Sequence, residues 1–305
     1  MKRPGFENLS SPVRTGASTA GFVLGLAASA ARALPMPVKK LFYRVPWLSR
    51  LIRKTLNRAA PSGLTRVKVA AGGLAGVQLD IDLQLEKDYW LGTYEPELQA
   101  AIRDLVHPGM VVYDVGANIG YISLLFARFT GPRGKVYAFE ALPANLERLK
   151  GNIQINALDF VIETVPAAVV DRAKPVRFLL GPSGGMGKAD GSAGRKDMIY
   201  SGHFDVQGVS LDEFHYASGF PAPHVVKMDI EGGEVLALPG MLRLLGEVRP
   251  LLLLELHGPE AANLAWKTLT AAGYRLCAMA PGYPAIAENA DLDWKTYLVA
   301  IWGQR

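Results

Sequence analysis

From residue 111 onward, short apolar runs alternate with longer segments of helical periodicity. The sequence predicts strands at 111–115, 136–140, 160–165, 225–230, 251–256, 274–279 and 296–302. It predicts helices between them, over 119–130, 143–156, 233–245 and 260–272. Continuous apolar runs separated by helices are typical of a parallel sheet with both faces covered. The predicted fold class is therefore α/β, with a mostly parallel seven-stranded sheet of Rossmann-like type.

The chain before this sheet has a different composition. Residues 1–60 contain eleven Lys and Arg and a single acid, Glu7, whereas the remaining residues contain more acids than bases. A basic extension on a mildly acidic body is typical of a tail with an anionic partner, and a membrane surface, nucleic acid and plain solubility all stay open. We divide the chain into a basic, partly helical or disordered extension (1–60), a small β-hairpin with a lead-in helix (61–104) and an α/β domain (105–305).

Two segments of the extension are apolar. Residues 17–31 are rich in Ala, Gly and Ser and are too short for a membrane span, so we expect a surface or disordered helix rather than a secretory signal. Residues 38–59 predict a basic amphipathic helix that begins at Pro46. Its apolar stripe consists of Trp47, Leu48, Leu51, Ile52 and Leu56. Such a helix either binds an anionic membrane surface or packs on its own domain, and both interpretations stay open.

Three further segments have a distinct local pattern. Residues 64–85 alternate and contain the Gly-rich stretch AAGGLAG, which predicts a β-hairpin or small sheet. A helix is predicted to begin at Glu95-Pro96 and to end before Gly109. Residues 181–203 are rich in Gly and have no period, so we expect a long loop, either a substrate lid or a disordered insertion.

A glycine turn follows the first strand of the α/β domain. Residues 111–115 lead into Gly116-Ala117-Asn118-Ile119-Gly120, and a helix follows. Such a turn lets the backbone approach a ligand at the carboxyl edge of the sheet. Glu140, at the end of the second strand, is placed to accept hydrogen bonds from both hydroxyls of a ribose. These residues indicate a nucleoside ligand.

The spacing of the turn identifies the nucleoside. Dinucleotide sites use GxGxxG, whereas this turn has Gly116-x-x-x-Gly120. Asp114 comes two residues before the first glycine, where an acid disfavours a pyrophosphate and suits an ammonium group. S-adenosylmethionine (SAM) has an ammonium group, a ribose and no phosphate. The motif therefore favours SAM over a nicotinamide cofactor.

At these residues the sequence resembles the FkbM-type SAM-dependent methyltransferases. The resemblance runs from about residue 85 to 257 and rests on YWLGTYEPE (89–97), VVYDVGANIGYISLLFA (111–127), GKVYAFEALPANLERLKGNIQIN (134–156), VSLDEF (209–214), VVKMDIEGGEVLALPGM (225–241) and RPLLLLELH (249–257). It implies a class I SAM-dependent methyltransferase domain. It also implies that Asp114, Gly116, Asn118, Gly120 and Glu140, with Ala117 in the same turn, belong to the SAM site. Ala141-Leu142-Pro143 departs from the family's usual Pro-Asn-like pair beside the adenine pocket.

The family methylates hydroxyl groups of sugars, polyketides and other metabolites. The resemblance therefore implies O-methylation of a hydroxyl on a sugar, glycolipid or secondary metabolite, without naming the acceptor. Glu95, at the start of the lead-in helix, is expected either to cap that helix or to reach the SAM ammonium.

Acidic residues and a histidine at two strand ends are the catalytic candidates. Asp229 ends an otherwise apolar strand, which needs a reason, and we expect it to position the acceptor or act as base. Glu231 is expected to share that role or to cap the next helix. Alternation places Glu255 and His257 on one face of the following strand, and His257 is a candidate base. We predict no metal, with a divalent ion between Asp229 and Glu231 as the weaker alternative.

Other functional classes are less consistent with the sequence. A SAM-binding protein of this fold without turnover is disfavoured because Asp114, Glu140 and Asp229 are all present. A nicotinamide-dependent oxidoreductase is disfavoured by the missing GxGxxG. Nucleic-acid binding is not expected, since the α/β domain has no basic aromatic patch. The single cysteine, Cys277, fits a reducing compartment. We expect a cytoplasmic location, with peripheral membrane association through residues 38–59 as an added hypothesis.

Overall fold

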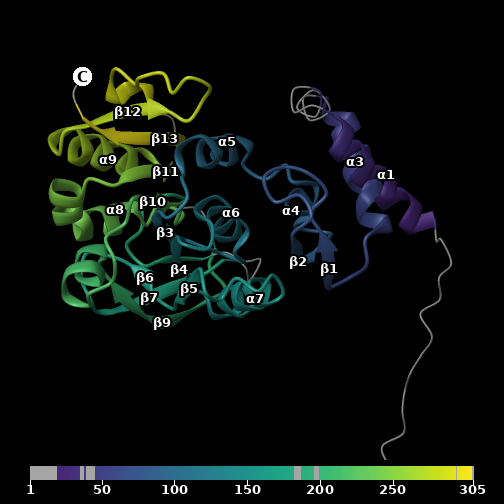
Figure 1. Cartoon of the computed structure of the whole chain (residues 1–305), viewed down its shortest axis with the longest axis horizontal. Coiled ribbons are helices and arrows are strands. Elements are labelled where there is room, and N and C mark those ends of the chain that lie inside the picture. The colour runs from purple at the N-terminus through teal and green to yellow at the C-terminus, as the bar shows by residue number, and fades with distance from the viewer. Residues whose placement is uncertain are drawn as a thin grey trace, which may run out of the picture.

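The computed structural model describes residues 19–34, 38, 45–181, 187–195, 199–292 and 294–303. Its centre is a seven-stranded sheet with the order β12-β13-β11-β10-β3-β4-β5 (Figure 1). In chain order these strands are β3 (Val111–Val115), β4 (Lys135–Phe139), β5 (Ile162–Val165), β10 (Val225–Met228), β11 (Leu251–His257), β12 (Tyr274–Ala278) and β13 (Lys295–Trp302). Only β13 runs antiparallel to its neighbours. The predicted mostly parallel, Rossmann-like sheet is confirmed.

Both faces of this sheet are covered, as its apolar runs predicted. Val112 of β3 packs in one buried cluster with Leu125, whereas the next residue, Tyr113, packs in a second cluster with Leu244 and Ala265. The helices around the sheet are α5 (Pro96–Leu105), α6 (Tyr121–Thr130), α7 (Pro143–Gln154), α8 (Glu234–Ala237) and α9 (Pro259–Ala271). Shorter helical turns are η1 (Glu213–Ala217), η2 (Leu238–Met241), η3 (Leu244–Val248) and η4 (Asn289–Asp291).

The single helix predicted over 233–245 is wrong. The structure divides this segment into α8, η2 and η3. Pro239 lies at the start of η2, where its ring and missing N–H prevent an uninterrupted helix.

A second sheet packs beside the first and contains four short strands. They are β6 (Ala168–Val169), β7 (Pro175–Leu180), β8 (Gly187–Ala189) and β9 (Gly202–Val209), in the order β6-β9-β7-β8. The long loop expected over 181–203 is therefore partly wrong, because β8 and the start of β9 lie within it. Residues 182–186 and 196–198 of that segment lie outside the described residues.

The N-terminal elements lie together at one end of the molecule (Figure 1). They are α1 (Thr19–Ala33), α3 (Pro46–Ala59), β1 (Leu64–Lys68), β2 (Gln78–Asp82) and α4 (Lys87–Leu91). β1 and β2 pair antiparallel, which confirms the predicted hairpin. α3 begins at Pro46 as predicted, whereas residues 39–44 of the proposed amphipathic segment lie outside the described part. Within that part, no helix has the length and apolar character needed to span a bilayer.

Candidate active site

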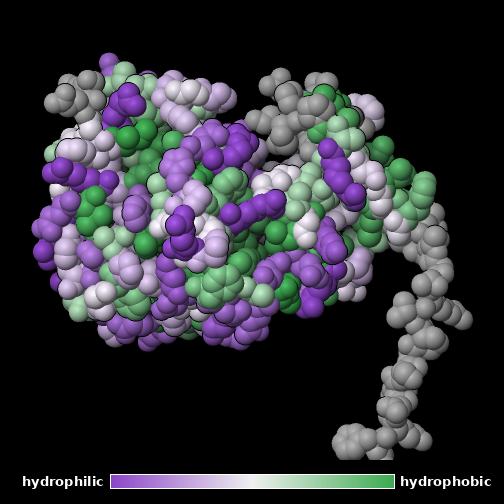
Figure 2. All heavy atoms as spheres, in the orientation of Figure 1, coloured by the Kyte–Doolittle hydropathy of each residue, from purple (hydrophilic) through white to green (hydrophobic). Residues whose placement is uncertain are grey.

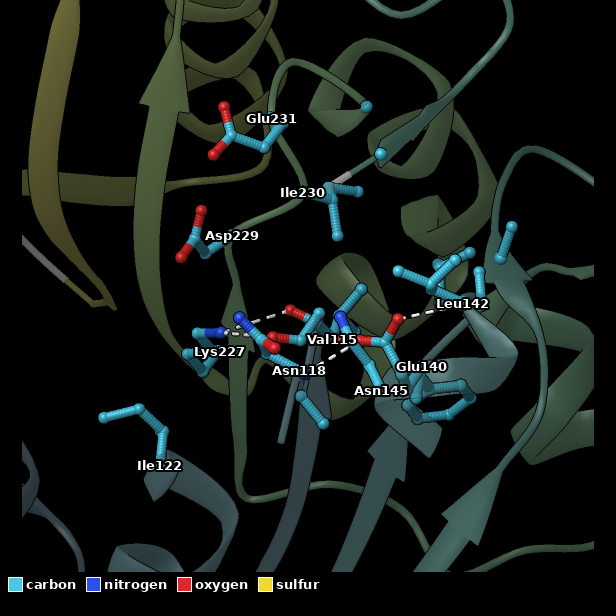
Figure 3. Close-up of a pocket in the computed structure, with 18 of the residues that line it drawn as sticks. Val115, Asn118, Ile122, Glu140, Leu142, Asn145, Lys227, Asp229, Ile230 and Glu231 are labelled. Carbon is cyan, nitrogen blue, oxygen red and sulfur yellow. Dashed lines mark hydrogen bonds between the residues drawn. The ribbon is translucent and has the colours of Figure 1, made fainter. Parts of the chain in front are cut away.

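A cavity lies at the carboxyl ends of β3, β4 and β10 (Figure 3). Its walls include the turn after β3 at Gly116 and Asn118, the end of β4 at Glu140, and Asp229 and Glu231 after β10. β3 is flanked by β4 on one side and by β10 on the other, so the strand order reverses here. In α/β sheets a reversal of this kind leaves a crevice that binds ligands.

Gly116 brings two strand ends close together. Its φ is +80°, and a Cβ added to it would lie 2.0 Å from the backbone oxygen of Asp229. No other residue fits without separating the turn from the segment after β10. Gly120 has a different role, because a Cβ added to it would lie 2.5 Å from Leu149 Cδ1 of α7. Gly120 is not among the cavity-lining residues, so the structure gives it a packing role.

Glu140 points into the cavity from the end of β4 (Figure 3). Its Oε2 accepts a hydrogen bond from the Asn118 backbone N–H at 2.7 Å, and its Oε1 accepts one from Leu142 N–H at 2.8 Å. Burial raises the pKa of this carboxyl, and the two hydrogen bonds oppose that rise. Each carboxylate oxygen keeps a lone pair for one further donor. The arrangement fits a ribose with two adjacent hydroxyls.

Asp114 is placed differently from the sequence prediction. Its side chain is fully buried, accepts a hydrogen bond from Ser123 Oγ at 2.6 Å and does not line the cavity. Its Oδ1 lies 3.3 Å from Lys227 Nζ. The prediction that Asp114 contacts the SAM ammonium is therefore wrong, because its carboxylate already interacts with Lys227 and Ser123. Asp114 instead holds Lys227 beneath the glycine turn.

Lys227 is a site residue whose role the local sequence did not indicate. It is buried at the centre of β10, lines the cavity and donates to the backbone oxygen of Gly116 at 3.0 Å. Burial disfavours its charged form, but the carboxylates of Asp114, Asp229 and Glu95 outweigh this and raise its pKa. The sequence does contain an indication of this role, because a lysine within an apolar strand requires a buried partner for its charge.

Three tyrosines form an aromatic wall of the cavity that the local sequence did not predict. Tyr89 and Tyr121 stack with ring centroids 5.0 Å apart, and Tyr94 meets Tyr89 edge-on at 4.5 Å. All three line the cavity. On the other side, Phe178 and Ala189 of the second sheet face the same space. Only the folded chain brings these segments together, since each lies in a different part of the sequence.

Glu95 precedes α5 in a left-handed conformation with φ of 41°. It makes no side-chain capping hydrogen bond, so the capping alternative is wrong. Its side chain shares a small cavity beside the main one with Lys227, Asp229 and Glu255. Burial raises the pKa of Glu95, Lys227 opposes the rise and Glu255 adds to it. Contact with the SAM ammonium stays a prediction that this position supports.

Asp229 lies where the main cavity and the small cavity meet. Its side chain is 19% exposed. Burial raises its pKa to about 8, with Lys227 opposing and the charges of Glu255 and Glu95 adding to the rise. At neutral pH this carboxyl is therefore mostly protonated, and its carboxylate form predominates only at higher pH.

The three predicted catalytic side chains are neighbours. His257 Nε2 lies 4.0 Å from Asp229 Oδ1, 3.8 Å from Glu231 Oε2 and 2.9 Å from Glu255 Oε1. Its Nδ1 lies 3.6 Å from Glu234 Oε1. Glu234, rather than Glu231, secures the turn, because it accepts a hydrogen bond from Ile230 N–H. Glu231 remains partly exposed at the cavity.

The environment of His257 corrects its expected role as base. Burial lowers the pKa of His257, but the nearby carboxylates of Glu234, Glu255 and Asp229 outweigh burial and raise the pKa to about 10. At neutral pH the ring is therefore protonated and cannot accept a proton. It instead supplies a fixed positive charge between the carboxylates.

One group of side chains here has the spacing of a metal site. Asp229, Glu255 and His257 each offer one atom within 4.8 Å of the others. However, Glu255 already accepts hydrogen bonds from His257 and Lys295. Burial would raise the pKa of Glu255, but these two cations lower it overall. His257 and Lys295 thus already supply positive charge beside Glu255, and a metal-free site stays a prediction.

Comparison with known proteins gives the family. Residues 114–276 match the model of the methyltransferase FkbM domain, which is more than half of the chain. A relative, hexuronic acid methyltransferase AglP of Haloferax volcanii, is 30% identical over 151 residues, covering 48% of this chain and 56% of that protein. The chain thus matches only about half the length of this relative.

Solved structures of low sequence identity also align with the chain. The FkbM methyltransferase of Methylobacillus flagellatus is 17% identical with a TM-score of 0.40, over 73% of this chain and 56% of that one. Aeropyrum pernix fibrillarin with bound SAM is 12% identical with a TM-score of 0.40, over 67% and 74%. Gly116, Asn118 and Glu140 line a cavity that fits SAM. SAM is the cofactor of this domain. The chain belongs to the FkbM family of SAM-dependent methyltransferases.

Proposed function

We propose that this protein transfers the methyl group of SAM to a hydroxyl group of a sugar, glycolipid or secondary metabolite. The observation that carries the proposal is the position of Asp229 at the cavity wall beside the glycine turn, where its carboxylate form can accept a proton from a hydroxyl. Burial raises its pKa to about 8, so this form predominates only above that pH. Its neighbours Lys227 and His257 hold positive charge on either side of it.

Several residues would hold the cofactor. Glu140 would accept hydrogen bonds from the ribose hydroxyls. Leu142 and Phe178 offer apolar surface for the adenine, and Glu95 offers a carboxylate for the ammonium. When bound, SAM supplies a methyl carbon bonded to positively charged sulfur.

The remaining chemistry belongs to the acceptor and Asp229. The methyl group would pass from sulfur to the acceptor oxygen, giving a methyl ether and S-adenosylhomocysteine. The Asp229 carboxylate would take up the hydroxyl proton. Holding the oxygen in line contributes up to ~7–11 kcal/mol to lowering the barrier, and the base contributes ~10²–10⁴-fold.

The charge of the acceptor side favours a hydroxyl over a carboxylate. Asp229 and Glu231 line the cavity, and Glu95 and Glu255 lie beside it. Lys227, His257 and Lys295 are already engaged with these or other carboxylates. Each of these cations already has a carboxylate partner, so a uronic acid carboxylate would have to compete for them. We therefore propose ether formation rather than the ester that a carboxyl acceptor would give.

The test uses SAM with a labelled methyl group and matched pairs of neutral glycosides and uronic acids. We expect label in the neutral glycoside, in a product that survives mild alkali as a methyl ether does. Label released as methanol by mild alkali would show ester formation and contradict the proposal. SAM binding without transfer to any acceptor in the panel would instead support a binding protein without turnover.

A further inference from the structure

A second cavity lies on the other side of α4 from the active site. Tyr89 of α4 lines the active-site cavity, whereas its neighbours Lys87, Asp88 and Leu91 line the second one. This second cavity, here called the α1–α3–α4 groove, has a volume of about 390 Å³. Its remaining lining residues are Leu26, Ala27, Ala30, Ala31, Leu34, Ile52, Arg53, Leu56, Leu85 and Thr93. Most of this lining is aliphatic, so the groove suits a hydrocarbon chain.

Two cations meet in this apolar groove. Burial lowers the pKa of Lys87, and the nearby charge of Arg53 lowers it further. Asp88 also lines the groove, where it accepts a hydrogen bond from Thr93 Oγ1 at 3.2 Å. The repulsion between the two cations would be relieved by an anionic group bound between them. The groove thus combines surface for a hydrocarbon chain with positive charge for an anion.

Large apolar side chains surround this groove and are exposed. Phe22 and Leu26 of α1 are 64% and 56% exposed, Trp47 and Leu51 of α3 are 65% and 55% exposed, and Leu85 is 77% exposed. Figure 2 shows hydrophobic surface gathered along α1 at the edge of the molecule. Exposed patches of this kind on a monomer mark an interaction surface.

The charged residues of α1 and α3 are all basic, whereas α4 adds Asp88 to the groove. α3 contributes the exposed bases Arg50, Arg53, Lys54 and Arg58. Residues 19–34 and 45–60 contain no Asp or Glu. Exposed apolar side chains beside bases, without acids, are typical of helices that lie in the surface of an anionic bilayer.

We propose that the α1–α3–α4 groove binds the acyl chain of an anionic membrane lipid. Arg53 and Lys87 contact the lipid phosphate, and Phe22, Trp47 and Leu51 enter the bilayer surface. The site is separate from the methyl-transfer site, so lipid binding requires neither SAM nor an acceptor.

The first experiment is co-sedimentation of the full chain with vesicles of phosphatidylglycerol or of phosphatidylcholine. We expect binding to phosphatidylglycerol that weakens with salt without vanishing, because the apolar part is not screened. We expect no binding to phosphatidylcholine at physiological salt. Protein that stays in solution with phosphatidylglycerol at low salt would overturn the proposal.

A second experiment separates the groove from general attraction to the surface. Ala30→Trp fills the groove, whereas Ala33→Trp places the same side chain at an exposed position of α1 that does not line it. The probe is a lysophosphatidylglycerol with a fluorescent acyl chain, used below its micelle concentration. We expect at least a tenfold loss of probe affinity for Ala30→Trp and less than a twofold change for Ala33→Trp. Equal affinities would exclude the groove as the lipid site.

Two variants that each remove one arginine of α3 test the role of charge. Arg53→Gln removes a base from the groove, and Arg58→Gln removes an exposed base from the same helix outside the groove. We expect about a fivefold loss of probe affinity for Arg53→Gln alone. Equal losses of affinity for Arg53→Gln and Arg58→Gln would show general attraction to the basic helix and overturn the proposal.

Light scattering tests whether a second copy of the chain occupies the groove. A wild-type dimer that Ala30→Trp converts to a monomer would place a second copy there and overturn the proposal too. A normal thermal shift with SAM confirms that each variant is folded, independently of methyl transfer.

Discussion

Lys227 Nζ lies 3.3 Å from Asp114 Oδ1, with both side chains buried beneath the glycine turn. The two residues face each other in the register of the parallel strands β10 and β3. Lys227 also donates to Gly116 O, and Ser123 donates to Asp114. The pair therefore joins the turn that would hold SAM to the strand that carries Asp229.

Removing one member of this pair should be costly. Lys227→Met leaves the buried Asp114 carboxylate without its counter-charge, so we expect a loss of ~3–5 kcal/mol in the free energy of unfolding. Urea denaturation measures it. The double variant Lys227→Met/Asp114→Asn removes both charges and should recover part of the loss. A single variant as stable as wild type would show that the pair contributes nothing.

Gly116→Ala should damage both stability and SAM binding. The new Cβ would meet the Asp229 backbone oxygen at 2.0 Å, in a backbone conformation with φ of +80°. Gly109→Ala is the matched control, because its φ is +87° but no atom lies within 4 Å of the added Cβ. We expect the control to lose ~1–2 kcal/mol from the left-handed backbone alone and to keep its SAM affinity. Calorimetry with SAM on both folded variants shows whether SAM affinity is lost through the clash with the Asp229 backbone oxygen or through backbone strain alone.

Glu140→Ala should weaken SAM binding with little effect on the acceptor. Losing hydrogen bonds to a charged group costs ~1.5–3 kcal/mol, or about 10–150-fold in affinity. Glu147→Ala on the exposed side of α7 is the control and should bind SAM as wild type does. Isothermal calorimetry measures both. If Glu140→Ala kept wild-type affinity, the ribose assignment would be wrong.

Asp229→Asn should keep SAM binding and lose transfer. The amide cannot accept the hydroxyl proton, so we expect kcat to fall ~10²–10⁴-fold while the affinity for SAM changes little. His257→Gln should lose less, because the protonated ring orients carboxylates and is not the base. A labelled-methyl assay with the identified acceptor measures both variants. Full turnover by Asp229→Asn would remove Asp229 from the mechanism.

The pH profile of methyl transfer should rise through the pKa of Asp229. Its pKa of about 8 means that the proton-accepting carboxylate forms as pH increases, so the rate rises and then levels off above that value. The positive sulfur of SAM favours the carboxylate and should shift the midpoint of the pH profile lower at saturating SAM.

The groups that face Asp229 are Lys227, Glu95, Glu231, Glu255 and His257. Lys227 and His257 have raised pKa values and stay protonated across this range. A profile that falls between pH 6 and 8, or an Asp229→Asn profile with the same rise, would contradict the assignment.

The sequence determined the strands of the main sheet. Buried parallel strands are mostly apolar on both faces, so β3, β10 and β11 appear as apolar runs in which Asp114, Lys227, Glu255 and His257 are the exceptions. It also located the strand ends from which Gly116, Glu140 and Asp229 reach the cavity, because parallel strands place their carboxyl ends at one edge. The start of α3 followed from Pro46. Each of these depends on residues that are close together along the chain.

Tertiary structure decided what those side chains contact. Asp114 was predicted to face SAM, but the register of β3 and β10 sets Lys227 against it. His257 was predicted to be a base, but Glu234 and Glu255 raise its pKa. The second sheet depends on pairing between β7 and β9, which the intervening Gly-rich segment separates. Burial and charge at a side chain depend on neighbours distant in the sequence. Local pattern therefore located part of the site, whereas the tyrosine wall, the role of Lys227 and the protonation of the side chains depend on the fold.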